Sequence, residues 1–289
     1  MFKIANQKKH YSTYILSDEE AHSLIEVVPE RGALITRWCV QDRDILYLDE
    51  ERFANPQLSV RGGIPILFPI CGNLPDNFYT YKGKQYTLKQ HGFARDLPWE
   101  VTEQVTDNLA SITLVLNSND RTRAVYPFDF QLAFTYQLRG NSLKIQHRYT
   151  NHSTENMPFS VGLHPYFLAE DKTQLDFDIP ASHYQDQRSK EIFPFTGNFD
   201  FNREEIDFAF TSINSNSTSL RDNRGRLEVK ISYSNIYSTL VFWTVKGKNY
   251  VCLEPWSAPR NALNTGEQLT NLESGDSYES VVEMSVNNF

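Results

Sequence analysis

Four segments of this 289-residue chain place a chemically capable side chain among glycine, proline and aromatic residues. They are Arg61–Asn77 (RGGIPILFPICGNLPDN), Gln90–Trp99 (QHGFARDLPW), Gly162–Phe167 (GLHPYF) and Leu253–Pro259 (LEPWSAP). Glycine lets the backbone approach a ligand closely, and proline fixes the local path of the chain. Binding and acid–base residues concentrate on loops of this kind.

His91 and His164 are the histidines inside these segments, and imidazole gains and loses its proton near neutral pH. Each stands beside glycine, proline or an aromatic residue, so we expect both to do proton chemistry. His147 lies on the apolar side of a strand pattern, and we expect it in the core. Four histidines outside the segments are expected to have no catalytic role: His10, His147, His152 and His183.

Glu254 and Arg61 are the charged residues whose neighbours suggest a role. Glu254 follows the apolar run 250–253, and a carboxylate at the end of a buried strand is costly to desolvate unless it is paired or working. The alternative is a solvated carboxylate at a strand end. Arg61 precedes a Gly-Gly pair and could orient a hydroxyl or a phosphate, or it could simply cover the loop. The sequence leaves both pairs of alternatives open.

Composition and missing patterns exclude several classes of function. The formal net charge of −8 and the pI of about 5.4 argue against a nucleic-acid partner, which needs a basic surface. No apolar run reaches the ~18 residues of a membrane helix, and the start lacks the apolar stretch of a secretory signal. We therefore expect a cytoplasmic protein that does not bind membranes. Its three scattered cysteines are expected to be free thiols.

No sequence pattern calls for a metal or a cofactor. The chain lacks GxSxG, GxGxxG, P-loop and HExxH motifs. It also lacks two histidines one residue apart on a strand, which a cupin-like metal site would need.

Alternation of apolar and polar residues predicts strands along much of the chain. Glycine- and asparagine-containing turns separate them, at 139–141, 222–225 and 246–249. The strand patterns cover residues 112–116, 128–138, 143–149, 227–233 and 239–245.

Helices are predicted at only two places, Asp18–Ile25 and Arg203–Phe210, and the polar stretch Ser212–Ser219 is predicted to be an exposed loop. Many strands with few helices favour an all-β fold, a large antiparallel sandwich. Strand patterns continue on both sides of the polar stretch, so one domain is expected over residues 1–289.

The four segments, in this order, resemble those of the aldose 1-epimerase (galactose mutarotase-like) superfamily from about Gly32 to the end of the chain. The most specific match is HGFAR at His91–Arg95 followed by Trp99, and Asp207 in EIDFAF is the matching aspartate. The resemblance implies a β-supersandwich that binds a small sugar in an open groove without metal or cofactor. HGFAR is similar to the LacX-like and hexose-6-phosphate 1-epimerase branches, so the implied substrate is a hexose or a hexose phosphate.

The resemblance also implies residue roles for interconverting the α and β anomers of that sugar. Glu254 would be the general base at the anomeric hydroxyl, and His164 the general acid at the ring oxygen. His91 would hydrogen-bond near that oxygen, and Arg61 and Asp207 would hold sugar hydroxyls.

If the substrate carries a phosphate, Arg61, Arg95 or both would bind it. The open alternative is that Arg95 pairs with Asp96 or Glu100 and only holds its loop. A carbohydrate-binding protein without catalysis is the main alternative function, and a glycoside hydrolase using two carboxylates is a third. The sequence makes no prediction of oligomeric state.

Overall fold

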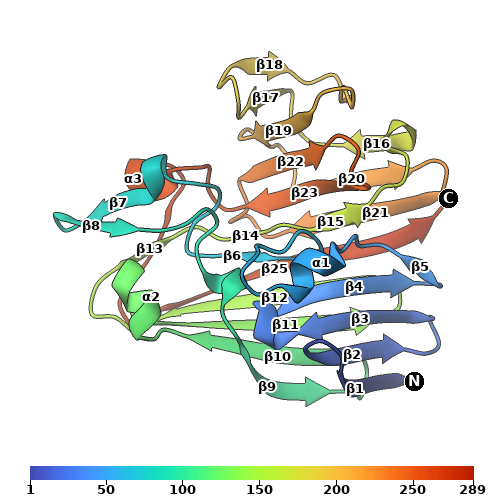
Figure 1. The fold of residues 1–289 in the computed structure, drawn as a ribbon, viewed down its shortest axis with the longest axis horizontal. Helices are drawn as coiled ribbons and strands as arrows, with labels where there is room; N and C mark the ends of the chain where they lie inside the picture. The colour runs from blue at the N-terminus through green and yellow to red at the C-terminus, as the bar shows by residue number, and fades with distance from the viewer.

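Two antiparallel eight-stranded sheets dominate the structure (Figure 1). The computed structural model describes all of residues 1–289, with about 51% in strands and 9% in helices. The all-β, antiparallel prediction is therefore confirmed. The first sheet has the order β16 (Leu175–Asp178), β20 (Ser217–Asp222), β21 (Leu227–Tyr233), β25 (Ser277–Asn288), β12 (Ser142–Asn151), β11 (Phe130–Arg139), β10 (Ala110–Asn117) and β9 (Glu100–Val105).

The second sheet carries the segments singled out above. Its order is β18 (Ile192–Pro194), β17 (His183–Asp186), β19 (Glu205–Phe210), β22 (Thr239–Val245), β23 (Tyr250–Trp256), β14 (Gly162–Leu163) and β6 (Ile66–Leu67), and β15 (Tyr166–Leu168) also pairs with β23. The β17–β18 hairpin stands at the top of Figure 1, and β9 and β1 lie at the opposite edge.

Smaller elements complete the fold. A five-stranded sheet runs β1 (Phe2–Lys8), β2 (Ser12–Asp18), β3 (Ser23–Val28), β4 (Leu34–Val40) and β5 (Arg43–Asp44). The two-stranded ribbons are β7 (Phe78–Tyr81) with β8 (Lys84–Thr87), and β13 (Met157–Phe159) with β24 (Thr270–Leu272). The helices are α1 (Glu50–Ala54), α2 (Asp120–Val125) and α3 (Ala262–Thr265), and 3₁₀ turns cover Pro29–Arg31, Pro75–Asn77, Ala94–Asp96 and Lys172–Gln174.

Alternation along the strands builds the core. In β11 every second residue, from Phe130 to Leu138, is buried, as the sequence pattern predicts. The three predicted turns all join neighbouring strands, namely β11 to β12, β20 to β21 and β22 to β23. One apolar cluster of 56 buried residues draws on the chain from Leu16 to Val286. This continuity supports one domain over 1–289, which stays a prediction.

The second sheet has two different faces because successive side chains in a strand point to opposite sides. In β23, Val251 and Leu253 join the main core. The alternate residues of the same strand lie in other clusters or line a cavity instead: Tyr250, Cys252, Glu254 and Trp256. The outer face of this sheet is therefore the platform for a site.

Both helix predictions are wrong. Residues 18–25 comprise the end of β2, a turn over 19–22 and the start of β3; Asp18 Oδ1 accepts from the Ala21 amide and Oδ2 accepts from the Gly140 amide. Arg203–Phe210 is mostly strand β19, which pairs with β22 at six positions. In both cases pairing with a neighbouring strand outweighs a weak local preference for helix. The predicted loop 212–219 ends early, since β20 begins at Ser217.

The three cysteines are free, as expected, and all three are buried. No helix in this structure is long and apolar enough to cross a membrane. The predicted cytoplasmic location stays a prediction.

His147 is a core histidine, as its strand position predicts. Its ring stacks on Phe134 at 4.4 Å between centroids, and Nδ1 lies 2.9 Å from the Tyr237 hydroxyl and 3.2 Å from that of Ser280. Burial lowers its pKa from 6.5 to about 3. As the pH falls below 6.5, His147 takes up a proton in the unfolded chain but stays neutral in the folded protein. The folded state therefore loses stability relative to the unfolded one.

We expect His147→Gln to reduce this acid sensitivity. One such histidine accounts for about 2 kcal/mol of the stability lost between pH 7 and pH 5. The measurement is the free energy of unfolding in urea at both pH values, with exposed His152→Gln as the control. An unchanged pH 7-to-5 difference in His147→Gln would contradict the assignment.

Candidate active site

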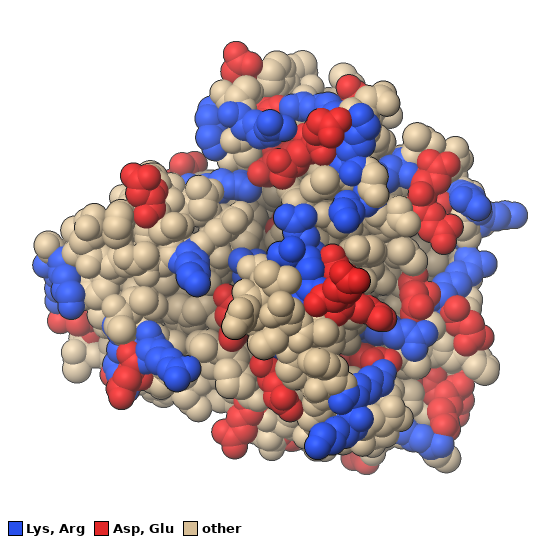
Figure 2. Space-filling model, in the orientation of Figure 1, with Lys and Arg blue, Asp and Glu red and all other residues tan.

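All six residues predicted for the site line one cavity of about 310 Å³ on the outer face of the second sheet. They are Arg61, His91, Arg95, His164, Asp207 and Glu254. Figure 2 shows a hollow near the centre of the molecule where basic side chains gather, over the region of β6, β14 and β23 in Figure 1. Residues almost 200 positions apart in the sequence thus meet in one place.

His164 and Glu254 form the centre of the cavity. His164 Nε2 lies 3.3 Å from Glu254 Oε1, and the Trp256 indole donates to Glu254 Oε2 at 3.0 Å. Glu254 is only 1% exposed, so the solvated strand-end reading is wrong. His164 sits between β14 and β15, with its ring stacked on Tyr166 at 4.7 Å. The carboxylate and the imidazole are therefore held by packing and touch directly.

His91 is fixed by two hydrogen bonds with Gly72. The His91 amide donates to the Gly72 carbonyl at 2.7 Å, and the Gly72 amide donates to His91 Nδ1 at 3.1 Å. Because Nδ1 accepts, the ring proton of the neutral imidazole is on Nε2, so Nε2 is a donor. The turn requires glycine next, since a Cβ on Gly92 would lie 2.2 Å from the Phe68 carbonyl oxygen.

Burial shifts the ionisation of all three groups toward their neutral forms. It lowers the pKa of His164 to about 3 and that of His91 well below 6.5, with positive Arg95 as the next cause for each. It raises the pKa of Glu254 well above 4.5, with Asp207 contributing. Perturbed groups that converge in a cavity are a mark of catalytic sites. Burial therefore favours a neutral His164 imidazole beside a protonated Glu254 carboxyl group.

Arg61 and Arg95 both line the cavity, and neither forms an ion pair. The Arg61 guanidinium lies 5.6 Å from the Trp243 ring centroid. Arg95 Nη2 donates to the Gln90 carbonyl at 3.0 Å, while its buried Nε has no partner. Burial lowers the Arg95 pKa. Arg95 does not pair with Asp96 or Glu100, so that alternative for its role is not observed.

Asp207 is held by a residue that the sequence analysis missed. Arg260 Nη2 lies 3.1 Å and 2.9 Å from the two Asp207 carboxylate oxygens, so this carboxylate already has a cationic partner. Burial raises the Asp207 pKa, and Arg260 opposes the rise. Gly72 makes room for the Arg260 stem, because a Cβ there would lie 2.3 Å from Arg260 Cγ. The sequence signal was close by, since Arg260 directly follows LEPWSAP.

Other cavity residues also went unpredicted. Arg52 enters from α1, and its Nε donates to the Ser59 carbonyl at 3.1 Å. Trp243 and Glu205 come from β22 and β19 and are joined by an indole-to-carboxylate hydrogen bond of 2.8 Å. Nothing in the local sequence distinguishes these residues from ordinary strand or surface positions. Trp243 and Glu205 reach the cavity through the pairing of β22 with β19, and Arg52 reaches it from α1.

His164, Cys252 and Glu254 offer ligand-type atoms within 4.8 Å of one another. A thiol binds metals as the thiolate. Burial raises the Cys252 pKa well above its ordinary value, which favours the poorly ligating thiol. The remaining donors are one imidazole and one carboxylate whose Nε2 and Oε1 atoms lie 3.3 Å apart, so the set fits a proton-transfer pair better than a metal centre.

The fold that carries this site matches that of galactose mutarotase-like proteins. A galactose mutarotase-like protein from Clostridium acetobutylicum has the same fold, with a TM-score of 0.85 at 19% identity over 100% of this chain and 99% of that one. The family model for aldose 1-epimerase matches residues 14–285. The chain belongs to the aldose 1-epimerase family and is an isomerase of the epimerase type.

Individual relatives agree with this assignment. The Slr1438 protein of Synechocystis sp. PCC 6803 is 47% identical, with a TM-score of 0.96 and complete coverage of both chains. The plasmid-encoded LacX protein of Lactococcus lactis subsp. lactis is 28% identical over 236 residues, 72% of this chain and 78% of that protein. A Cenchrus ciliaris protein provisionally named a glucose-6-phosphate 1-epimerase is 23% identical over 263 residues, 82% of this chain and 76% of that protein. The family resemblance read from the four segments is confirmed.

Proposed function

We propose that this protein interconverts the α and β anomers of an aldohexose by acid–base opening and closure of the sugar ring, with hexose 6-phosphates as the preferred substrates. The observation that carries the proposal is the direct contact of His164 Nε2 with Glu254 Oε1 at 3.3 Å in a sugar-sized cavity. Anomerisation needs a base at O1 and an acid at O5, two oxygens on the same carbon. A neighbouring acid and base match that requirement.

Ring opening moves two protons, one from the sugar to Glu254 and one from His164 to the sugar. Glu254 takes the proton of O1–H, and the electron pair of that bond becomes the second C1–O1 bond. The C1–O5 bond breaks, and O5 takes a proton from His164. After rotation about C1–C2, the reverse transfers close the ring on the other face of the aldehyde. Protons and electrons balance over the cycle, so the reaction requires no redox partner.

The active form of the pair is a carboxylate beside an imidazolium, which holds one proton in total. Burial favours this one-proton state, because it raises the Glu254 pKa and lowers that of His164. The neutral form differs from the active one only by moving that proton across the His164–Glu254 contact. A bound sugar favours the active form because O1–H donates to the carboxylate and O5 accepts from the imidazolium. The His91 Nε2–H group would donate toward the same oxygen as negative charge develops.

The arginines support a phosphorylated substrate. Arg52, Arg61 and Arg95 line the cavity without a carboxylate partner, whereas Arg260 is paired with Asp207. Partly buried guanidinium groups without counter-charge suit a dianionic phosphate, which they bind through strong charge-assisted hydrogen bonds. The pairing of Asp207 also weakens the hydrolase alternative, since that carboxylate is not free to flank a scissile bond.

The test compares glucose with glucose 6-phosphate by polarimetry of freshly dissolved α-anomers. Arg61→Ala or Arg95→Ala should lower kcat/KM for glucose 6-phosphate by about 10- to 150-fold more than for glucose, which corresponds to about 1.5–3 kcal/mol for one charge-assisted contact. Arg148→Ala, an exposed arginine on β12 outside the cavity, is the control.

Each other outcome points to a different conclusion. Equal losses on both sugars would mean that the arginines hold hydroxyls or the loop, and a neutral hexose would then be the substrate. No acceleration of mutarotation for either sugar, with sugar binding intact, would favour the non-catalytic carbohydrate-binding alternative.

A further inference from the structure

The 49–61 loop forms part of the wall of the catalytic cavity. The Asp49 amide donates to the Arg61 carbonyl at 2.9 Å, so the two ends of the loop lie side by side. The loop contains α1 and brings Arg52 and Arg61 to the cavity. None of its residues is buried. A segment with so little packing against the core opens easily unless something outside it holds it closed.

Arg31 holds this loop from outside the cavity. It ends the 3₁₀ turn that starts at Pro29, and it is only 6% exposed. Its Nη2 donates to the carbonyls of Asn55 and Leu58 at 3.3 Å and 3.2 Å. Its Nη1 donates to the Pro56 carbonyl at 3.5 Å. A helix leaves its last carbonyls without partners inside the helix, and a planar guanidinium can donate to several of them at once just after α1.

Tyr11 supports the same contact. Its ring centroid lies 5.8 Å from the Arg31 guanidinium, and its hydroxyl donates to the Ala54 carbonyl at 3.2 Å. All three hydrogen bonds of Arg31 end on backbone carbonyls of the 49–61 loop. A buried cation is unfavourable unless its donors are satisfied, so closing the loop also stabilises Arg31.

The turn that carries Arg31 also contacts the segment of Arg95. A Cβ on Gly32 would lie 2.2 Å from the Arg95 carbonyl oxygen. The Trp99 amide donates to the Pro29 carbonyl at 3.0 Å. Arg95 and the loop therefore share one support outside the cavity.

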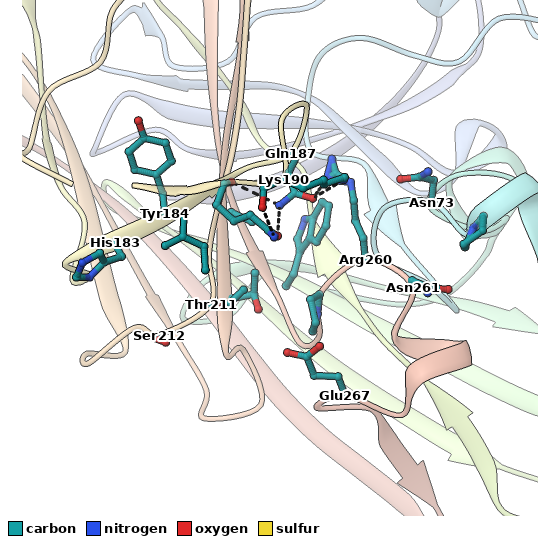
Figure 3. A pocket seen from close by; sticks show the side chains of 17 residues that line it. Asn73, His183, Tyr184, Gln187, Lys190, Thr211, Ser212, Arg260, Asn261 and Glu267 are labelled. Atoms are coloured by element: carbon teal, nitrogen blue, oxygen red, sulfur yellow. Dashed lines mark hydrogen bonds between the residues drawn. The ribbon is translucent and has the colours of Figure 1, made fainter. Parts of the chain in front are cut away.

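Arg260 is held in a different way, from within the site. Figure 3 looks into a neighbouring cavity of about 620 Å³ that Arg260 also lines, and there its Nη1 donates to Gln187 Oε1 at 3.4 Å. Its Nη2 pairs with Asp207. The groups proposed to move protons, His164 and Glu254, come from the second sheet and not from the loop. A loosened loop should therefore weaken sugar binding and spare proton transfer.

We propose that Arg31 is a positioning residue for sugar binding: it holds the 49–61 loop in the conformation that presents Arg52 and Arg61 to the substrate. Side chains that are fixed in advance bind with a smaller entropic cost. This inference rests on the proposed epimerase function for its kinetic consequence. The loop conformation and the sugar affinity that it predicts do not depend on turnover.

Arg31→Met removes the three carbonyl hydrogen bonds and keeps an unbranched side chain in their place. The sugar is glucose 6-phosphate, or glucose if the wild type binds that better. Its KM and its calorimetric Kd should both rise by about 10-fold, while kcat stays within about 2-fold. The amides of Phe53 and Asn55 should exchange their hydrogen at least about 10-fold faster, with those of β11 unchanged.

Arg43→Met is the matched control. Arg43 also donates to a turn carbonyl, that of Gly225 at 2.6 Å, but it does not line the catalytic cavity. Its substitution should leave KM and the exchange of the loop amides unchanged. Arg31→Lys keeps the charge without the planar fork and should recover only part of the lost affinity.

Tyr11→Phe tests the same contact if Arg31→Met does not fold, which far-ultraviolet circular dichroism reports. It removes only the hydroxyl that donates to the Ala54 carbonyl. The same KM should then rise by about 3-fold, as the loss of one hydrogen bond would give, and the loop amides should exchange faster.

The outcomes separate this inference from the proposed function. If the wild type accelerates mutarotation but the folded Arg31 and Tyr11 variants keep its KM, the inference is wrong and the epimerase function stands. The inference is equally wrong if Arg31→Met lowers kcat at unchanged KM, because that pattern indicates a loss of active protein. If no sugar is mutarotated but Arg31→Met weakens sugar binding and loosens the loop, the inference stands and the epimerase function fails. A wild type that binds neither sugar would overturn both.

Discussion

Glu254→Gln should lower kcat for anomerisation by at least about 100-fold while leaving sugar affinity nearly unchanged. The carboxamide has the shape of the carboxyl group, and its oxygen can still accept from the Trp256 indole, which bonds Glu254 Oε2 in the wild type. The carboxamide cannot take the O1 proton, so the loss should appear in kcat. The measurements are polarimetric kcat and a calorimetric dissociation constant for the same sugar.

Glu205→Gln is the matched comparison. Glu205 lines the same cavity and also accepts from an indole, that of Trp243, but it makes no contact with His164. The same chemical change should therefore cost far less turnover than Glu254→Gln. Near wild-type kcat in Glu254→Gln, or equal losses in the two variants, would remove Glu254 from the role of base.

The second large effect concerns the two histidines at the ring oxygen. His164→Asn removes the proposed acid and should cost at least about 100-fold in kcat. His91 and His164 lie 5.6 Å apart between ring centroids, and we propose that both act at the same ring oxygen, so their effects should not be independent. The double variant with His91→Asn should lose about as much activity as His164→Asn alone. Losses that simply multiply would show that the histidines act separately.

The pH profile gives this prediction a second readout. In the proposed mechanism the His164–Glu254 pair is active when it holds one proton. The acid limb of kcat/KM therefore reports the uptake of a second proton, and the basic limb reports the loss of the first. Burial lowers the His164 pKa to about 3, so the acid limb should lie well below pH 6.5, and burial raises the Glu254 pKa, so the basic limb should lie above the usual range of a carboxyl group. An acid limb near pH 6.5 in the wild type would indicate a solvated histidine in place of the buried pair.

The sequence by itself determined the strand content and most of the reactive groups. Period-two alternation is a property of a single strand, so the pattern over 128–138 identifies β11 without knowledge of its neighbours. Glycine and proline beside His91 and His164 similarly mark loops by local backbone chemistry. The helix prediction for Arg203–Phe210 failed because it used local sequence alone. This segment forms β19, which is stabilised by pairing with β22, about 35 residues further along the chain.

Only the tertiary structure decided which groups meet and in what electrostatic state. The Gly72 amide sets the orientation of His91, and Arg260 neutralises Asp207, from positions 19 and 53 residues away. The pKa shifts of His164 and Glu254 arise mainly from burial, which depends on every element packed around the cavity. Partner choice and desolvation are long-range properties, and no local pattern of residues encodes them.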